Sequence, residues 1–357
     1  MNKVFLNTLF VGTQGAYLRL ENEQVFVELP EDEAPAEPGS RSSEPRKTVL
    51  KVPLHHLGSI VLFGRVFASL PLVERCAEDS RSLVLMTEHG RFRARVQGRT
   101  TGNVLLRKAQ YDHHADPEST ARLARTIVAG KIQNARQVLL RAARDAKDPL
   151  KGPFLHAAEV HAALLASLGD TLNIDEIRGA EGMAAAAYFE TFDAMITAQR
   201  ADFRFDGRTR RPPRDRVNCL LSFLYSLWTN DCVAALEGVG LDPQFGFLHV
   251  LRPGRPALAL DLVEEFRSVF LDRLCLTLIN RRQIASEDLS IRDGGSVALT
   301  DDGRKKVLSA YQRRKQEEIR HPLLKQKVPI GLLPHIQARL LARHLRGELP
   351  NYLPYQP

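Results

Sequence analysis

The stretch ESTARLARTIVAGKIQNARQVLLRAARD, residues 118–145, decides the fold because it divides the chain into two parts of different character. Its apolar residues recur every three or four positions, which predicts an amphipathic helix or a pair of helices. Upstream, residues 1–100 hold short β-branched and aromatic runs separated by turns, whereas helical spacing continues downstream. The sequence therefore predicts an α+β protein, with an N-terminal β-sheet domain (1–100) followed by a larger all-α-helical domain (101–357).

Three segments interrupt this simple pattern. Residues 30–47 are rich in proline, acids and serine, which predicts a flexible loop between two strands. Residues 66–80 predict one helix within the β domain, beginning near Pro71. The C-terminal sequence NYLPYQP is too rich in proline for a helix, which leaves an interaction tail or a disordered end as alternatives.

The composition limits the class of protein only loosely. The 357 residues include 50 Lys and Arg against 42 Asp and Glu, a net charge of +8 that favours polyanionic partners weakly. The four cysteines form no CxxC pair, so we expect reduced, mostly buried thiols and no zinc site. We find no signal peptide and no run of about 18 apolar residues, so we expect a cytoplasmic protein without a membrane span.

The segment GFLHVLRPGRPALALDLVEEFR, residues 246–267, places one imidazole and several acids inside an apolar run. From Pro256 onward the spacing of Leu258, Leu262, Phe266 and Val269 predicts a helix. On that helix Asp261 and Glu264 share a face, Arg267 can orient Glu264, and His249 comes from the preceding segment. Such ligands suit magnesium or manganese. A solvated acidic face beside a core histidine would give the same pattern.

A second acid, Glu181, precedes four alanines in IRGAEGMAAAAYFETF, residues 177–192. A small-residue face allows close helix packing, so Glu181 would be half-buried and would require a compensating cation or proton. Arg178 lies one turn before it and Tyr188 two turns beyond it. The simpler alternative is an acid favoured by the helix dipole.

The third candidate feature is a basic loop, RFDGRTRRPPRDR, residues 204–216. Guanidinium groups match phosphate oxygens, so this loop could hold a nucleic-acid backbone. A second basic run at 304–321 is explained equally well by a solvated helix. The sequence contains no GxxxxGK[ST], GxGxxG, GxSxG or HExxH motif that would indicate nucleotide, serine-hydrolase or zinc-protease chemistry.

Seven blocks occur in an order and spacing shared by one known family. They are TGNVLLRKAQY (101–111), VAGKIQNARQVLLR (128–141), IRGAEGMAAAAYF (177–189), RRPPRDRVNCLLSFLY (210–225), GLDPQFGFLH (240–249), RPALALDLVEEFR (255–267) and IQARLLARHLRGELPNYLPY (336–355). Together they resemble the CRISPR-associated integrase-endonucleases, the larger subunit of the spacer-acquisition complex. The long loop at 30–47 is a departure from shorter relatives.

The resemblance implies a site and a reaction. It implies that Glu181, His249 and Glu264 bind Mg²⁺ or Mn²⁺ and are catalytic, with Asp261 as a supporting or alternate ligand. The implied reaction inserts new spacer DNA into a CRISPR array: a DNA 3′-hydroxyl attacks a phosphodiester at the repeat boundary. We further expect Tyr188 to position DNA. The basic residues expected to hold DNA are Arg178, Arg208, Arg210, Arg211 and Arg214.

The resemblance also implies partners and leaves alternatives. It implies double-stranded DNA, a homodimer made through the β domain, and a small ferredoxin-like adaptation protein flanked by two such dimers. A stand-alone nuclease for branched DNA would use the same residues and hydrolyse rather than join strands. A catalytically silent DNA-binding scaffold is the second alternative, and the intact set of two acids and an imidazole speaks against it.

Overall fold

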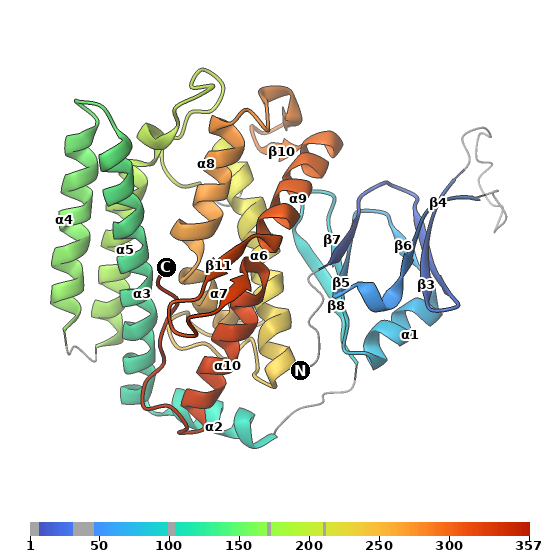
Figure 1. The fold of residues 1–357 in the computed structure, drawn as a ribbon, viewed down its shortest axis with the longest axis horizontal. Coiled ribbons are helices and arrows are strands. Elements are labelled where there is room, and N and C mark those ends of the chain that lie inside the picture. The colour runs from blue at the N-terminus through green and yellow to red at the C-terminus, as the bar shows by residue number, and fades with distance from the viewer. Residues whose placement is uncertain (1–6, 31–45, 99–103, 170–172, 210–211) are drawn as a thin grey trace. The chain divides into compact units, whose positions relative to one another are not determined.

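The computed structural model describes residues 7–30, 46–98, 104–169, 173–209 and 212–357. They fall into two compact units, Met1–Thr100 and Thr101–Pro357. The first unit is built mainly of strands and the second mainly of helices (Figure 1), which confirms the expected fold class. The segment predicted as a loop, residues 30–47, lies outside the described residues except at its two ends, which belong to strands.

The N-terminal unit contains two four-stranded sheets. In the first, of order β1-β5-β7-β8, only β8 runs antiparallel to its neighbour; in the second, of order β4-β3-β2-β6, only β6 pairs in parallel. The strands are β1 (Thr8–Val11), β2 (Tyr17–Glu21), β3 (Gln24–Pro30), β4 (Arg46–Pro53), β5 (Ser59–Phe63), β6 (Phe67–Ala68), β7 (Ser82–Met86) and β8 (Phe92–Val96). Seven of them coincide with predicted runs, and the two-residue β6 was not predicted.

The core of this unit follows from the alternation of its strands. Val25 and Val27 of β3 point inward while Phe26 between them does not, as expected for a sheet with one buried face. One helix, α1 (Leu70–Glu78), contributes Leu72 and Cys76 to the same core. The Ser69 hydroxyl accepts a hydrogen bond from the Leu72 backbone N–H, and α1 begins at Leu70, next to the Pro71 at which a start was predicted. A short turn, η1 (Leu54–His56), follows β4.

The second unit is built of long helices, with short elements between them. The helices are α2 (Val104–Ala115), α3 (Pro117–Asp145), α4 (Lys151–Leu168), α5 (Ile174–Glu190), α6 (Arg216–Val239), α7 (Ala257–Glu264), α8 (Arg273–Asn280), α9 (Asp301–Gln316) and α10 (Leu333–Leu345). The short elements are η2 (Phe192–Met195), η3 (Arg267–Asp272), η4 (Ser286–Asp288), β9 (Leu289–Ile291), β10 (Val297–Leu299), β11 (Glu318–Arg320), β12 (Lys327–Pro329) and η5 (Ile330–Leu332). The two hairpins, β9–β10 and β11–β12, correct the expectation of an all-helical second domain.

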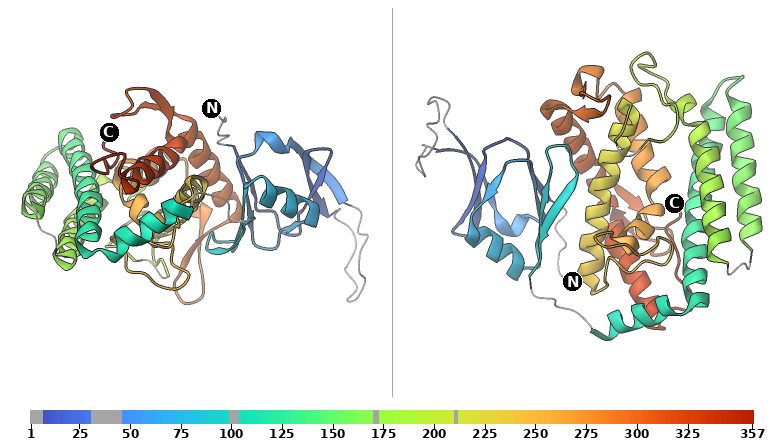
Figure 2. Two further views of the ribbon diagram at one scale, coloured as in Figure 1. Left: turned by 90° about the horizontal axis from the view of Figure 1, so that it is seen from below. Right: turned by 180° about the vertical axis from the view of Figure 1, so that it is seen from behind.

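Helix α3 connects two groups of helices. It packs against α4 and α5 on one side, and against α7 and η3 on the other. Figures 1 and 2 show α3, α4 and α5 side by side, next to the group that contains α6, α7 and α10. Residues on the middle of α3 therefore lie where both groups meet.

The helix predicted from Pro256 onward is interrupted after Glu264. The segment η3 is one turn of π-helix, in which the Leu271 backbone N–H approaches the Phe266 carbonyl five residues earlier. The wider turn shifts the buried face by one residue, so Phe270 is buried where helical spacing had indicated Val269. The segment then continues as α8.

Two expectations about apolar segments can be compared with the structure. The cysteines Cys76, Cys219, Cys232 and Cys275 are free and buried, which confirms the reading of reduced thiols. Within the described ranges, α6 alone has the length and mean hydropathy to cross a membrane. About two thirds of that apolar window (67%) is buried inside the unit, as is typical of a core helix.

The C-terminal segment is packed rather than disordered. Tyr352 and Tyr355 are buried, and their hydrogen-bond partner is the fully buried carboxyl of Glu265. The Tyr352 hydroxyl donates to Oε1 of that carboxyl, and the Tyr355 backbone N–H donates to Oε2 at 2.7 Å. Burial raises the pKa of Glu265 to about 7, although these donors lower it. The segment also lies against α3, because a Cβ on Gly130 would come within 2.7 Å of Pro354.

Replacing Tyr352 by phenylalanine tests this packing. The change leaves a buried carboxyl without one donor, so we expect the free energy of unfolding to fall by about 1–3 kcal/mol. Chemical denaturation measures the effect. The control is Tyr111→Phe, whose hydroxyl donates to Asp242 at 3.0 Å in a part-buried position, and which should cost less. Equal losses for the two variants would contradict a special role of the buried pair.

Candidate metal centre

Four elements of the helical unit place side chains at one position. Helix α5 supplies Glu181, the end of α7 supplies Glu264, and the segment between α6 and α7 supplies His249. The fourth side chain, Lys131 of α3, was not predicted. Its ammonium forms ion pairs with Oε1 of Glu181 and, at 2.7 Å, with Oε2 of Glu264. The structure thus brings the two predicted acids together around a lysine.

His249 completes this group. Its Nε2 lies 3.7 Å from Oε1 of Glu264, and its Nδ1 lies 2.7 Å from Oδ1 of Asp261. Because Asp261 is a carboxylate, the nitrogen bonded to it, Nδ1, carries a proton, and Nε2 is the nitrogen that faces Glu264. A histidine held in this way by a carboxylate is the usual arrangement of a metal-binding imidazole.

Asp261 supports the site rather than adding a ligand to it. The side chain is fully buried, and both oxygens already accept hydrogen bonds. Oδ2 accepts the backbone N–H groups of Phe247 and Leu248, and Oδ1 accepts that of His249 in addition to the imidazole. The alternative role as a metal ligand is therefore not favoured, because no lone pair is left toward Glu264.

The segment that carries His249 is fixed at several points. Gly246 has no room for a side chain, since a Cβ would lie 2.7 Å from Oδ2 of Asp261. The Gln110 side-chain amide donates to the carbonyls of Asp242 and Phe245 at 2.8 and 2.9 Å. Arg178 donates from Nε to the Leu248 carbonyl at 3.0 Å. The backbone before His249 is thereby tied to α2, α5 and α7.

The charge of Glu264 is stabilised although the residue is only 2% exposed. Burial alone would raise the pKa of its carboxyl, but Arg267, Lys131 and His249 outweigh burial and hold the pKa at about 2. Arg267 lies 2.8 Å from Oε1, as the sequence had indicated. Glu264 is therefore ionised at any physiological pH.

The donor set fits a hard divalent cation, although the side chains do not yet form a cage. Two carboxylates and an unprotonated imidazole nitrogen are ligands that Mg²⁺ and Mn²⁺ accept. Oε2 of Glu264 is buried and has no hydrogen bond of proper geometry, although the Lys131 ammonium is close. Among the described residues, no three His, Cys, Asp or Glu side chains converge tightly enough to hold an ion as they stand.

The predicted DNA-binding residues have diverse surroundings. Arg208 donates to Oδ1 of Asn218 and to the Thr209 carbonyl, and its guanidinium lies over the Tyr225 ring, so it holds the loop to α6. Arg214 is exposed. Arg210 and Arg211 lie outside the described residues. Tyr188 is 4% exposed and packs edge-on against Phe189, so its ring is not available to DNA in this conformation.

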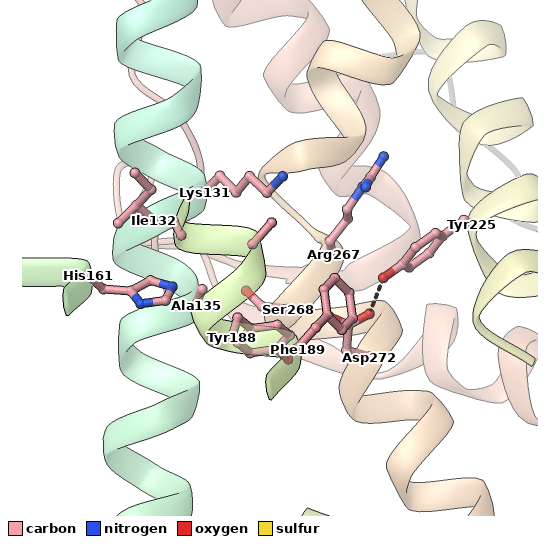
Figure 3. Close-up of a pocket in the computed structure, with 12 residues that line it drawn as sticks. Lys131, Ile132, Ala135, His161, Tyr188, Phe189, Tyr225, Arg267, Ser268 and Asp272 are labelled. Atoms are coloured by element: carbon pink, nitrogen blue, oxygen red, sulfur yellow. Dashed lines mark hydrogen bonds between the residues drawn. The ribbon is translucent and has the colours of Figure 1, made fainter. Parts of the chain in front are cut away.

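A small cavity of about 30 Å³ lies beside the site, which is room for a water molecule. Figure 3 shows Lys131 reaching from α3 toward Arg267 above it, and Asp272 bonded to Tyr225 below. The Tyr225 hydroxyl donates to Asp272 at 2.5 Å. Among the described residues, Nε2 of His161, which also lines the cavity, has no hydrogen-bond partner. Neither Tyr225 nor Asp272 was singled out from the sequence.

The burial of Lys131 could have been predicted from its position in the sequence. The buried face of α3 includes Ala124, Val128, Ala135 and Val138, and Lys131 falls between them at helical spacing. A lysine on the buried face of an amphipathic helix requires a carboxylate partner. The sequence could therefore have indicated that an acid from another element faces this turn, although not which acid.

Comparison with known proteins identifies a family. A sequence profile described as "CRISPR associated protein Cas1" matches residues 9–313. The "CRISPR-associated endonuclease Cas1 1" of Moorella thermoacetica is 52% identical over 354 residues, which cover 99% of this chain and 98% of that protein. The protein of the same description from Chlorobaculum tepidum is 50% identical over 354 residues, which cover 99% of each chain.

A solved structure also resembles the chain. A Cas1 protein from Thermotoga maritima has a TM-score of 0.77 at 23% identity, covering 95% of this chain and 97% of that one. At that identity the likeness shows the fold alone, and the fold is an N-terminal strand-rich unit with a helical unit after it.

Asp272 should make stability depend on pH. Burial raises its pKa from 3.8 to about 6, although Tyr225 and Arg267 act in the opposite direction. The folded protein then binds more protons than the unfolded chain between these values, so the free energy of unfolding falls as pH rises through this window. Asp272→Asn cannot ionise and should lack this part of the fall.

Urea denaturation of both proteins across this pH range measures the difference. As pH rises from the acidic end to neutral, the free energy of unfolding of Asp272→Asn should increase relative to that of the wild type by up to about 3 kcal/mol. Parallel profiles for the two proteins would show that Asp272 is not the buried acid responsible.

Proposed function

Because the chain belongs to the Cas1 family of CRISPR-associated proteins, we propose that it is a metal-dependent integrase and DNA endonuclease of CRISPR adaptation. In this reaction a 3′-hydroxyl of incoming DNA attacks a phosphodiester at the repeat boundary; a new phosphodiester forms and a 3′-hydroxyl leaves. The observation that carries the proposal is that three separate elements bring Glu181, Glu264 and His249 together: the two carboxylates share the Lys131 ammonium, and Nε2 of His249 lies 3.7 Å from Glu264. The endonuclease names of its relatives support it.

Glu181, His249 and Glu264 would hold Mg²⁺ or Mn²⁺. A divalent ion there would stabilise the negative charge that develops on the phosphate. The chain's own groups prepare the position: Asp261 fixes the imidazole tautomer, and Arg267 keeps Glu264 ionised. Asp261 and Arg267 thus hold His249 and Glu264 in position before metal or substrate binds.

The remaining proposals concern DNA and partner proteins. Arg214 is exposed next to the start of α6 and is the described arginine of this loop best placed to contact a phosphate. Arg178 and Arg208 are engaged with the protein, so we assign them to shaping the site. We propose that the strand-rich unit forms the homodimer, that the helical unit is catalytic, and that a ferredoxin-like adaptation protein joins two such dimers.

A strand-joining assay tests the function. It combines the protein, its small adaptation partner, a short duplex with free 3′-hydroxyls and a supercoiled plasmid bearing a repeat, with Mn²⁺, Mg²⁺ or a chelator. We expect metal-dependent joined product, and its loss in Glu181→Gln. The matched control is Glu190→Gln, an exposed acid on the same helix, which should join normally. Shorter strands without joining would instead indicate the stand-alone nuclease, and binding without chemistry the scaffold.

Replacing Asp261 by asparagine tests the positioning of His249. The amide cannot accept all the hydrogen bonds that the carboxylate accepts, so the imidazole loses its fixed tautomer. We expect Mn²⁺ affinity to fall by about 10–100-fold. Calorimetric titration gives the affinity, and thermal melting verifies folding. Asp242→Asn, a change in the same segment at a carboxylate that accepts the Tyr111 hydroxyl, serves as control and should leave the affinity unchanged. Unchanged affinity in a folded Asp261→Asn protein would remove His249 from the ligand set.

A further inference from the structure

Lys131 occupies a position that the proposed metal would need. Its side chain is 12% exposed and reaches from α3 to both carboxylates. Figure 3 shows it extended toward Arg267. The ammonium contacts Oε1 of Glu181 and Oε2 of Glu264, the oxygens of two residues that lie 83 positions apart in the sequence (264 minus 181).

The two oxygens of Glu264 have different neighbours. Oε1 lies 2.8 Å from Arg267 and 3.7 Å from Nε2 of His249, whereas Oε2 lies 2.7 Å from the Lys131 ammonium, which also contacts Oε1 of Glu181. Metal–oxygen bonds of about 2.1 Å and ammonium–oxygen contacts of about 2.8 Å are too short for both cations to share one pair of oxygens. The two would also repel each other at that separation.

We propose that Lys131 is a resident cation that holds the Glu181 and Glu264 carboxylates together until a divalent ion displaces it. The inference rests on the proposed function, because it assumes that these carboxylates bind metal. Without a cation, two carboxylates this close would repel each other and Glu264 would be a buried, uncompensated charge. The lysine therefore preserves the geometry of the site in the absence of metal, and it lowers the apparent metal affinity by competition.

Mn²⁺ titration of the protein and its variants tests the proposal. Lys131→Met and Lys131→Gln remove the competing charge, so each should bind Mn²⁺ tighter than the wild type, by at least about tenfold. Lys131→Arg retains a cation and should bind about as weakly as the wild type. The control is Lys315→Met, which removes another buried lysine, 2.7 Å from Asp231, and should leave Mn²⁺ affinity unchanged.

A second readout is stability. Without metal, Lys131→Gln should melt at a lower temperature than the wild type, and saturating Mn²⁺ should raise its melting temperature more than it raises that of the wild type. If Lys131→Met does not fold, the comparison of Lys131→Gln with Lys131→Arg still tests whether a positive charge at position 131 competes with Mn²⁺.

The outcomes separate the two proposals. Mn²⁺ affinity that is weakened by Glu181→Gln but unchanged or weakened in Lys131→Gln would overturn the role of the lysine while the metal site stands. Equal Mn²⁺ affinity of the wild type and Glu181→Gln would overturn the metal site and the lysine proposal together. Tighter binding in Lys131→Gln with wild-type affinity in Lys131→Arg would establish the competition.

Discussion

The ionised carboxylate of Glu264, buried inside the helical unit, is the constraint on which the rest of the site depends. A buried charge without partners costs several kcal/mol, so the fold must bring cations to it. The two cations are Arg267, from the turn after α7, and Lys131, from α3, and the segment before α7 adds the imidazole of His249 beside them. Each is held in turn by further contacts, of which the four hydrogen bonds to Asp261 are the most concentrated. The geometry proposed to bind a divalent ion is the same geometry that makes this buried charge tolerable.

The break after α7 determines which side chains lie beside the cavity. A continuous α-helix would keep the spacing predicted from Pro256, with Val269 on the buried face. The π-turn of η3 instead advances the chain by one residue, so that Phe270 is buried and Asp272 meets the Tyr225 hydroxyl beside the cavity. Irregular turns of this kind are frequent at functional sites, because a side chain can be aimed where regular spacing would not place it.

The elements were largely predictable from the sequence, whereas the contacts between them were not. Seven strands follow from their β-branched and aromatic runs between turns, α3 from three- and four-residue spacing, and α1 from its proline. Glu181, His249 and Glu264 were selected by residue type and resemblance, and the fold places them together. The sequence did not predict the roles of Lys131, Asp272 or the pair of Glu265 with Tyr352, because each depends on a partner from a distant element. Local periodicity shows which face of a helix is buried, but not what it is buried against.

Glu264 and Glu265 are neighbours with the same side chain, yet burial and partners make them different acids. One faces two cations and has a pKa of about 2; the other faces two tyrosines and a glutamine and has a pKa of about 7. At neutral pH one is an anion and the other carries a proton for much of the time. A slip of one residue at the end of α7 would place a partly neutral acid toward the metal position and an anion toward the apolar C-terminal segment. The register of the last turn of α7 thus determines the charge of the site, and the sequence alone does not indicate that register.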